Sequence, residues 1–133
     1  VLRHADGKVE TRRKDNLNLN GGFDFICAAI AGSSRPAIMG FTAVGTGTTS
    51  VAATQSGLTN EIKRKAASYA HTPGTKVFTL TTNFAAGEAT GAITQARICN
   101  AASGGTFLDR VTFDVINKAA DDTMTTTFQF TLS

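Results

Sequence analysis

The side chains that could do chemistry are few in this sequence, and they are widely separated. Its two histidines, His4 and His71, fall in a charged N-terminal segment and in a His-Thr-Pro-Gly turn. Neither is expected to be held beside a nucleophile and a carboxylate, as a catalytic triad requires. Paired carboxylates occur at Asp121-Asp122, which have the character of turn residues. We therefore expect this protein not to be an enzyme.

The cysteines and the glycine-rich loop predict no metal or phosphate site. Cys27 and Cys99 lie far apart and lack the spacing of zinc ligands, so no metal and no other cofactor is expected. Both are expected to be buried free thiols, with a disulfide within or between chains as the alternative. The run GTGTT at residues 45–49 lacks the lysine and the following helix of a phosphate-binding loop, and is interpreted as a strand connection.

Basic residues near the N-terminus are the first remaining candidate site. The net charge is +3, and residues 1–15 hold five of the 13 basic residues and three of the 10 acidic ones. The basic character of the chain is therefore mild and partly local to this segment. The candidate partner-binding residues are Arg3, Lys8, Arg12, Arg13 and Lys14.

The triplet Lys63-Arg64-Lys65 is the second basic group. On a strand, Lys63 and Lys65 share one face and Arg64 takes the other. The triplet predicts an edge or an interface, since lysine on an exposed edge opposes unwanted strand pairing. A role in nucleic-acid binding is disfavoured, because no aromatic side chains accompany the triplet as a stacking platform.

Residues 1–19 predict an extended arm. Their apolar side chains are too scattered for the period of a helix or a strand, and alone they cannot offset the entropy of ordering. We therefore expect the arm to be ordered by a partner. The segment lacks the apolar region of a signal peptide, and the chain has no apolar run near the ~20 residues of a membrane span, so no membrane partner is expected. Whether residues precede Val1 in the gene product stays open.

The elements that must position these residues begin with a helix over residues 20–31. Asn20 is a plausible N-cap, and Gly32 is a plausible stop. Four apolar side chains recur at helical spacing and are expected to form one apolar stripe: Phe23, Ile26, Cys27 and Ile30.

Beyond the helix, the sequence predicts about six strands. It contains 21 Thr and 9 Phe, which suit pleated sheets whose outer faces carry hydroxyl groups. The strands are expected over residues 38–44, 61–70, 75–84, 92–99, 106–115 and 123–132, with a helical turn at 56–59 and a helix as the alternative at 61–70. Ser103-Gly104-Gly105 predicts a hairpin turn.

Three of these strands have predicted inward faces. Residues 75–84 place Phe78, Leu80 and Phe84 on one face, with Thr82 among them. The other two inward faces are Phe107, Val111, Phe113 and Val115 over residues 106–115, interrupted by Asp109, and Met124, Thr126, Phe128, Phe130 and Leu132 over residues 123–132. The predicted fold class is mainly β: an antiparallel β-sandwich, residues 20–133, with one short N-terminal helix and an extended N-terminal arm, residues 1–19.

From residue 38 onward, the order of motifs resembles a family of small tailed-phage structural proteins, assigned to heads or tails. The motifs are structural turns and strands: Gly45–Gly47, Leu58 with Glu61, Gln95-Ala96-Arg97, Gly104-Gly105, Arg110 and Lys118. Gln95 and Arg97 depart from the acidic and glycine residues that are commoner in that family. The resemblance carries no catalytic residues.

The resemblance implies a virion protein assembled in the host cytoplasm. We expect a capsid decoration or cement protein that binds the major capsid protein, or other virion proteins, and stabilises the shell. The first alternative is a tail-fibre, collar or baseplate module, and the second is a basic nucleic-acid-binding module. A homo-oligomer is expected, with a trimer favoured, because a body with few charges and open sheet edges packs readily against copies of itself.

Overall fold

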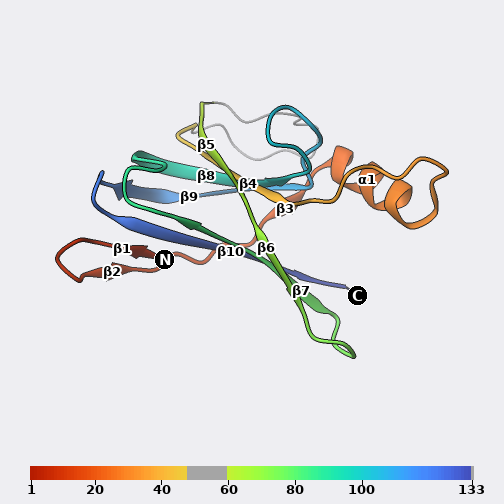
Figure 1. The fold of residues 1–133 in the computed structure, drawn as a ribbon, viewed down its shortest axis with the longest axis horizontal. Helices are drawn as coiled ribbons and strands as arrows, with labels where there is room; N and C mark the ends of the chain where they lie inside the picture. The colour runs from red at the N-terminus through yellow and green to blue at the C-terminus, as the bar shows by residue number, and fades with distance from the viewer. Residues whose placement is uncertain (48–59, 133) are drawn as a thin grey trace.

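A computed structural model describes residues 1–47 and 60–132 of the chain. Within them, two five-stranded antiparallel sheets pack as a sandwich, with one short helix near the N-terminus (Figure 1), so the predicted fold class is confirmed. The predicted turn at residues 56–59, and Leu58 of the family pattern, lie outside the described residues. The elements are β1 (Leu2–Arg3), β2 (Val9–Glu10), β3 (Leu17–Asn18), α1 (Asn20–Ala31), β4 (Phe41–Gly45), β5 (Glu61–Ala66), β6 (Ser68–His71), β7 (Val77–Phe84), β8 (Gly91–Cys99), β9 (Asp109–Lys118) and β10 (Thr123–Thr131).

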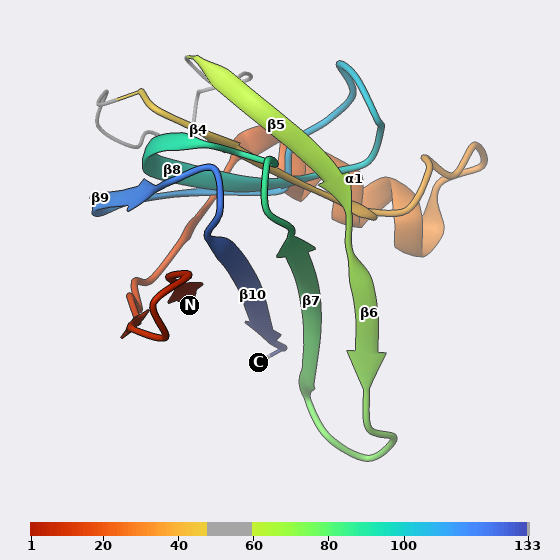
Figure 2. The same ribbon diagram turned by 60° about the vertical axis from the view of Figure 1, so that its left-hand side comes forward.

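The chain passes from one sheet to the other at a corner between β5 and β6. One sheet has the order β2-β1-β10-β7-β6, and the other has the order β3-β9-β8-β4-β5. Ala67 alone separates β5 from β6, and its N–H donates to the carbonyl of Gly40 at 2.8 Å. Figure 2 shows β6 continuing the course of β5 into the second sheet. The predicted strand over residues 61–70 is therefore confirmed, but it serves both sheets.

The main core lies between the sheets and follows the alternation along β7 and β10. Met124 and Phe128 of β10 are buried, while Thr127 between them is exposed, as predicted. Thr82 of β7 is buried because its hydroxyl bonds to that of Thr42 on β4, at 2.8 Å. Leu132, expected to face inward, is 65% exposed because it lies just beyond the end of β10.

The inward face of β9 differs from the prediction in its second half. Val115 was expected to face the core, but it is 45% exposed and its neighbour Ile116 is buried. The register between β8 and β9 shifts at this point, since Gln95 pairs with Thr112 whereas Ile93 pairs with Ile116. The regular alternation is interrupted at this irregularity, and beyond it the buried positions of β9 have even numbers.

Helix α1 has the predicted bounds but presents its apolar stripe to solvent. The N-cap position belongs to Leu19, not Asn20, and no side chain caps the helix, while Gly32 is its C-cap as predicted. Gly22 is the one buried residue of the helix, and a Cβ there would lie 2.2 Å from the carbonyl oxygen of Leu108. Phe25 is partly buried and packs against the main core, so the helix meets the body through Gly22 and Phe25 and then extends beyond the ends of the strands (Figure 1).

Residues 1–19 are attached to both sheets, which corrects the expectation that only a partner could order them. Leu2 pairs with Met124 of β10, and Leu17 pairs with Arg110 of β9. Leu2 and Leu19 are fully or almost fully buried, at 0% and 1% exposed. The scattered apolar residues are sufficient to order this segment because its short strands place single side chains, such as Leu2 in β1 and Leu19 beside β3, against the core of the sandwich. In the part of the chain that the structure describes, no helix is long and apolar enough to span a membrane.

Candidate functional site

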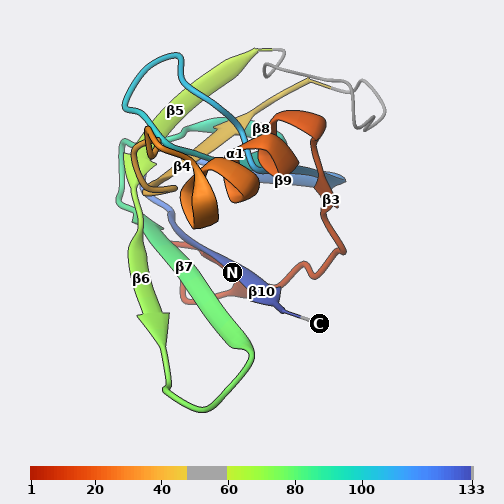
Figure 3. The same ribbon diagram turned by 90° about the vertical axis from the view of Figure 1, so that its right-hand side faces the viewer.

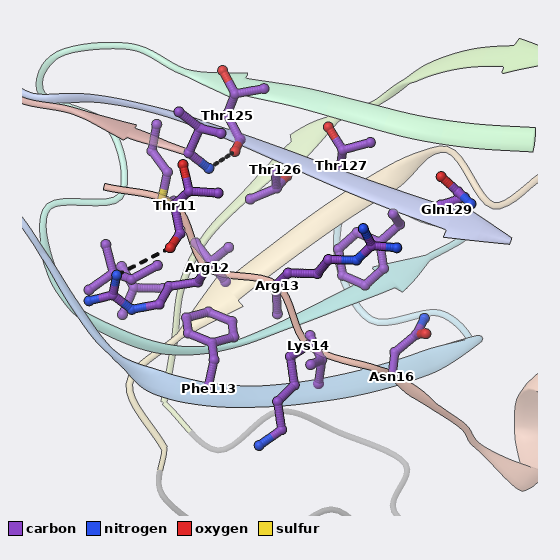
Figure 4. Close-up of a pocket in the computed structure, with 18 of the residues that line it drawn as sticks. Thr11, Arg12, Arg13, Lys14, Asn16, Phe113, Thr125, Thr126, Thr127 and Gln129 are labelled. Carbon is purple, nitrogen blue, oxygen red and sulfur yellow. Dashed lines mark hydrogen bonds between the residues drawn. The ribbon is translucent and has the colours of Figure 1, made fainter. Parts of the chain in front are cut away.

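A cavity of about 480 Å³ lies between the two sheets. Residues 11–16 cross its mouth on the way from β2 of one sheet to β3 of the other, and we call this segment the strap (Figures 3 and 4). Beside the strap, β9 and β10 are paired only along their first two residues. There β1 pairs with Thr123 and Met124 of β10, and β3 pairs with Asp109 and Arg110 of β9. The far ends of β9 and β10 therefore flank the opening.

Apolar side chains from both sheets form the buried part of the cavity wall, and polar side chains of the strap and of β10 form the rest. Among the β10 hydroxyls at the cavity, Thr126 Oγ1 is buried and has no hydrogen-bond partner among the described residues. Its side chain points from β10 into the cavity (Figure 4), which agrees with its predicted place on the inward face. The apolar residues of the wall are Val44, Ile93, Ala96, Val111, Phe113, Ile116, Met124 and Phe128.

The strap brings positive charge to this apolar cavity. Arg12 pairs with Glu10 at 3.3 Å, but within the described residues Arg13 and Lys14 form no ion pair. Asp15 supplies one negative charge at the same mouth. The N-terminal amine of Val1 also lies at the cavity and donates to the carbonyl of Thr125 at 2.8 Å. Burial and the nearby Arg3 lower the pKa of this amine.

The five basic residues predicted in the arm are divided between two places. Arg3 and Lys8 lie in the exposed β1–β2 hairpin, where Lys8 approaches Asp6 at 3.8 Å. The other three lie together on the strap: Arg12, Arg13 and Lys14. The structure thus groups three of the predicted residues around a hollow that the sequence did not indicate.

The triplet on β5 lies at a sheet edge, and two of its members are engaged within the chain. Arg64 donates to Glu61 at 2.7 and 3.1 Å and to the carbonyls of Ala101 and Gly104 at 2.9 and 2.8 Å. This arginine therefore holds the turn before β9. Lys65 pairs with Glu88 at 2.7 Å, which lowers the pKa of that glutamate together with the N–H of Ala85.

His4 forms a bridge that sequence reasoning missed. Its Nε2 lies 2.6 Å from Glu10 Oε2, and its Nδ1 lies 3.1 Å from Asp122 Oδ2. The hydrogen bond to Glu10, followed by the charge of Asp122, raises the pKa of His4 above its ordinary value. Asp122 is buried and also accepts the N–H of Ala119 at 2.8 Å. These contacts hold the N-terminal hairpin against the turn before β10, so they are structural.

A buried polar cluster lies where the strap meets β9. Arg110 donates through Nε to Gln95 Oε1 at 3.1 Å, and the guanidinium of Arg97 lies 4.6 Å from the ring centre of Phe107. Asn16, the last residue of the strap, donates to Asp109. The motif residues Gln95, Arg97 and Arg110 therefore belong to the interior of the sandwich, and burial lowers the pKa of Arg97 to about 10.

Because of Asp109, the contribution of this cluster to the free energy of unfolding should depend on pH. Burial raises its pKa to about 7, while bonds from Asn16 and the Ile98 N–H act in the opposite direction. The folded protein therefore keeps a proton that the unfolded chain loses near its ordinary pKa of about 3.9. The Asp109 contribution to the free energy of unfolding should fall as the pH rises from about 4 to about 7.

We expect Asp109→Asn to remove this component, measured by urea unfolding across that pH window. His4, whose pKa is also raised, is present in both proteins, so the difference between them isolates Asp109. An unchanged pH dependence in the variant would show that the carboxyl titrates alike in both states.

The cysteines and acidic residues add no further site to the described residues. Cys99 is buried, as expected, but Cys27 is exposed on α1, and both are free thiols. Within residues 1–47 and 60–132, no three histidine, cysteine or acidic side chains are grouped to hold a metal ion. Comparison with protein-family models, with curated proteins and with solved structures finds no match to this chain.

Proposed function

We propose that this chain is a phage virion structural protein of the capsid-decoration or cement class. In this role it binds the major capsid protein of the assembled shell and stabilises it, without catalysis. The observation that carries the proposal is the exposed apolar stripe of α1. Phe23, Ile26 and Ile30 are 51%, 38% and 73% exposed on one helix.

Exposing an apolar stripe of this kind to water is unfavourable, and burying it against a partner would be favourable. Ile38 follows the helix and is 82% exposed, which extends the apolar surface into the connection to β4. Because α1 meets the sandwich through Gly22 and Phe25, the stripe of Phe23, Ile26 and Ile30 can dock on a shell without disturbing the core. The family resemblance from residue 38 onward supports the same class of protein.

The test uses purified shells and two variants of the stripe, Phe23→Ser and Ile30→Ser. Burying one large apolar side chain contributes about 1.5–3 kcal/mol, so each variant should bind the shells at least roughly tenfold more weakly. The control is Tyr69→Ser, since Tyr69 is 68% exposed on β6, away from the helix. Equal binding by all four proteins would reject the stripe as the contact.

Copy number separates the head from the tail. A copy number in purified virions comparable to that of the shell protein supports decoration, and a small fixed number supports a tail-fibre, collar or baseplate module.

We also propose a trimer, because closed symmetry is the usual outcome of self-association. Light scattering at micromolar concentration tests the soluble state, and a map of the particle with isolated single copies would refute the trimer on the virion.

A further inference from the structure

We infer that the cavity beneath the strap binds an amphipathic anion, a long-chain carboxylate whose hydrocarbon tail lies between the sheets and whose head lies at Arg13 and Lys14. This binding site is independent of the virion role. It rests on the volume of the cavity, on the polarity of its wall and on the charge at its mouth.

The volume is that of a ligand site. Protein interiors are packed closely enough that voids larger than a water molecule are few, whereas ligand pockets measure about 300–1,000 Å³. The cavity, at about 480 Å³, falls within the second range. Its wall comes from β4, β8 and β9 of one sheet and β10 of the other, so it lies inside the sandwich.

The wall favours a hydrocarbon chain. Eight aliphatic, aromatic or thioether side chains form its buried part, and an apolar surface of this kind binds apolar molecules in preference to water, while the polar residues lie toward the strap and along β10. Burying a hydroxyl without a partner is unfavourable, and Thr126 Oγ1 is such a group within the described residues. In the proposed complex the carboxylate head lies between the strap and Thr126, so that it accepts from this hydroxyl as well as from Arg13 and Lys14.

The charge at the mouth selects an anion. Arg13 and Lys14 lie on the strap beside the opening, and neither is neutralised by an ion pair within the described part of the chain. Asp15 offsets one of the two charges, which leaves the mouth net positive. Figure 4 shows the side chains of Arg13 and Lys14 extending from the strap at the cavity. Carboxylates bind such cations through charge-assisted hydrogen bonds.

The experiment measures binding of dodecanoate to the full chain by titration calorimetry, with dodecylammonium as the probe of reversed charge. We expect saturable binding of dodecanoate at one site per chain. Dodecylammonium, which has the same tail, should bind at least about tenfold more weakly, because the cations at the mouth repel it. Absence of saturable dodecanoate binding, or equal binding of both probes, would overturn the inference.

Variants assign the binding to the cavity. The double change Arg13→Gln and Lys14→Gln should weaken dodecanoate binding about tenfold or more, and Thr126→Val should weaken it by a smaller factor while keeping the side-chain shape. The matched control is Arg3→Gln with Lys8→Gln, which removes two exposed charges of the hairpin and should leave binding unchanged. Equal losses in the two double variants would mean that net charge, and not this site, attracts the probe.

Vesicles of phosphatidylglycerol distinguish a free ligand from a membrane surface. The apolar part of the cavity lies between the sheets and is reached past the strap, so a single acyl chain should enter it more readily than a lipid packed in a bilayer. We expect dodecanoate to bind in the absence of vesicles and the vesicles not to sediment the protein. Binding to vesicles without binding of free dodecanoate would refute the cavity as the site.

Discussion

Replacing Phe128 with alanine should lower the free energy of unfolding by about 3–5 kcal/mol, the usual cost of emptying a buried aromatic site. Phe128 is 7% exposed and faces Leu80 across the pair formed by β10 and β7. Its ring also lies 6.3 Å from that of Phe130, nearly parallel to it. Removing the ring would enlarge the cavity between the sheets, so the lost contacts would not be restored by collapse. Urea unfolding followed by circular dichroism measures the change.

The neighbouring residues provide the controls for Phe128. Thr127→Ala should cost less than about 1 kcal/mol, because this side chain is exposed on the outer face of β10. Phe130→Ala should fall between the two, because Phe130 is only partly buried and stacks on Phe78 with ring centres 5.0 Å apart. Similar costs at positions 127 and 128 would mean that the faces of β10 are assigned wrongly.

Deleting residues 1–19 should destabilise the protein by more than about 5 kcal/mol and leave it largely unfolded. The deletion removes two buried leucines, Leu2 and Leu19, each of which would cost about 2–5 kcal/mol even as a change to alanine. It also removes β1, β2 and β3, and it uncovers Met124 and the cavity between the sheets. Circular dichroism and the urea midpoint of the truncated chain measure the effect.

Two point variants separate this loss from a loss of charge. Arg3→Ala changes an exposed side chain of β1 and should shift the urea midpoint little, whereas Leu2→Ala should reproduce a large part of the effect of deletion. A truncated chain with the urea midpoint of the full protein would restore the interpretation of residues 1–19 as an arm that only a partner orders.

Short-range patterns were sufficient for much of the fold. The alternation along β10 predicted the buried positions Met124 and Phe128, because a strand turns successive side chains to opposite faces whatever lies around it. Gly104 and Gly105 adopt positive φ angles of 60° and 77°, conformations that glycine adopts without steric cost. The bounds of α1 also followed from its local spacing. Each of these features depends on residues close together in the chain.

Tertiary contacts decided the rest, because a local pattern shows which side chains share a face but not what covers that face. The stripe of α1 has helical spacing, yet Phe23 is 51% and Ile30 is 73% exposed, so the described chain leaves much of the stripe uncovered. Leu2 becomes buried only because it pairs with Met124, which lies more than a hundred positions away. The cavity and its strap arise in the same way, from segments that are distant in sequence and that only the closed sandwich brings together.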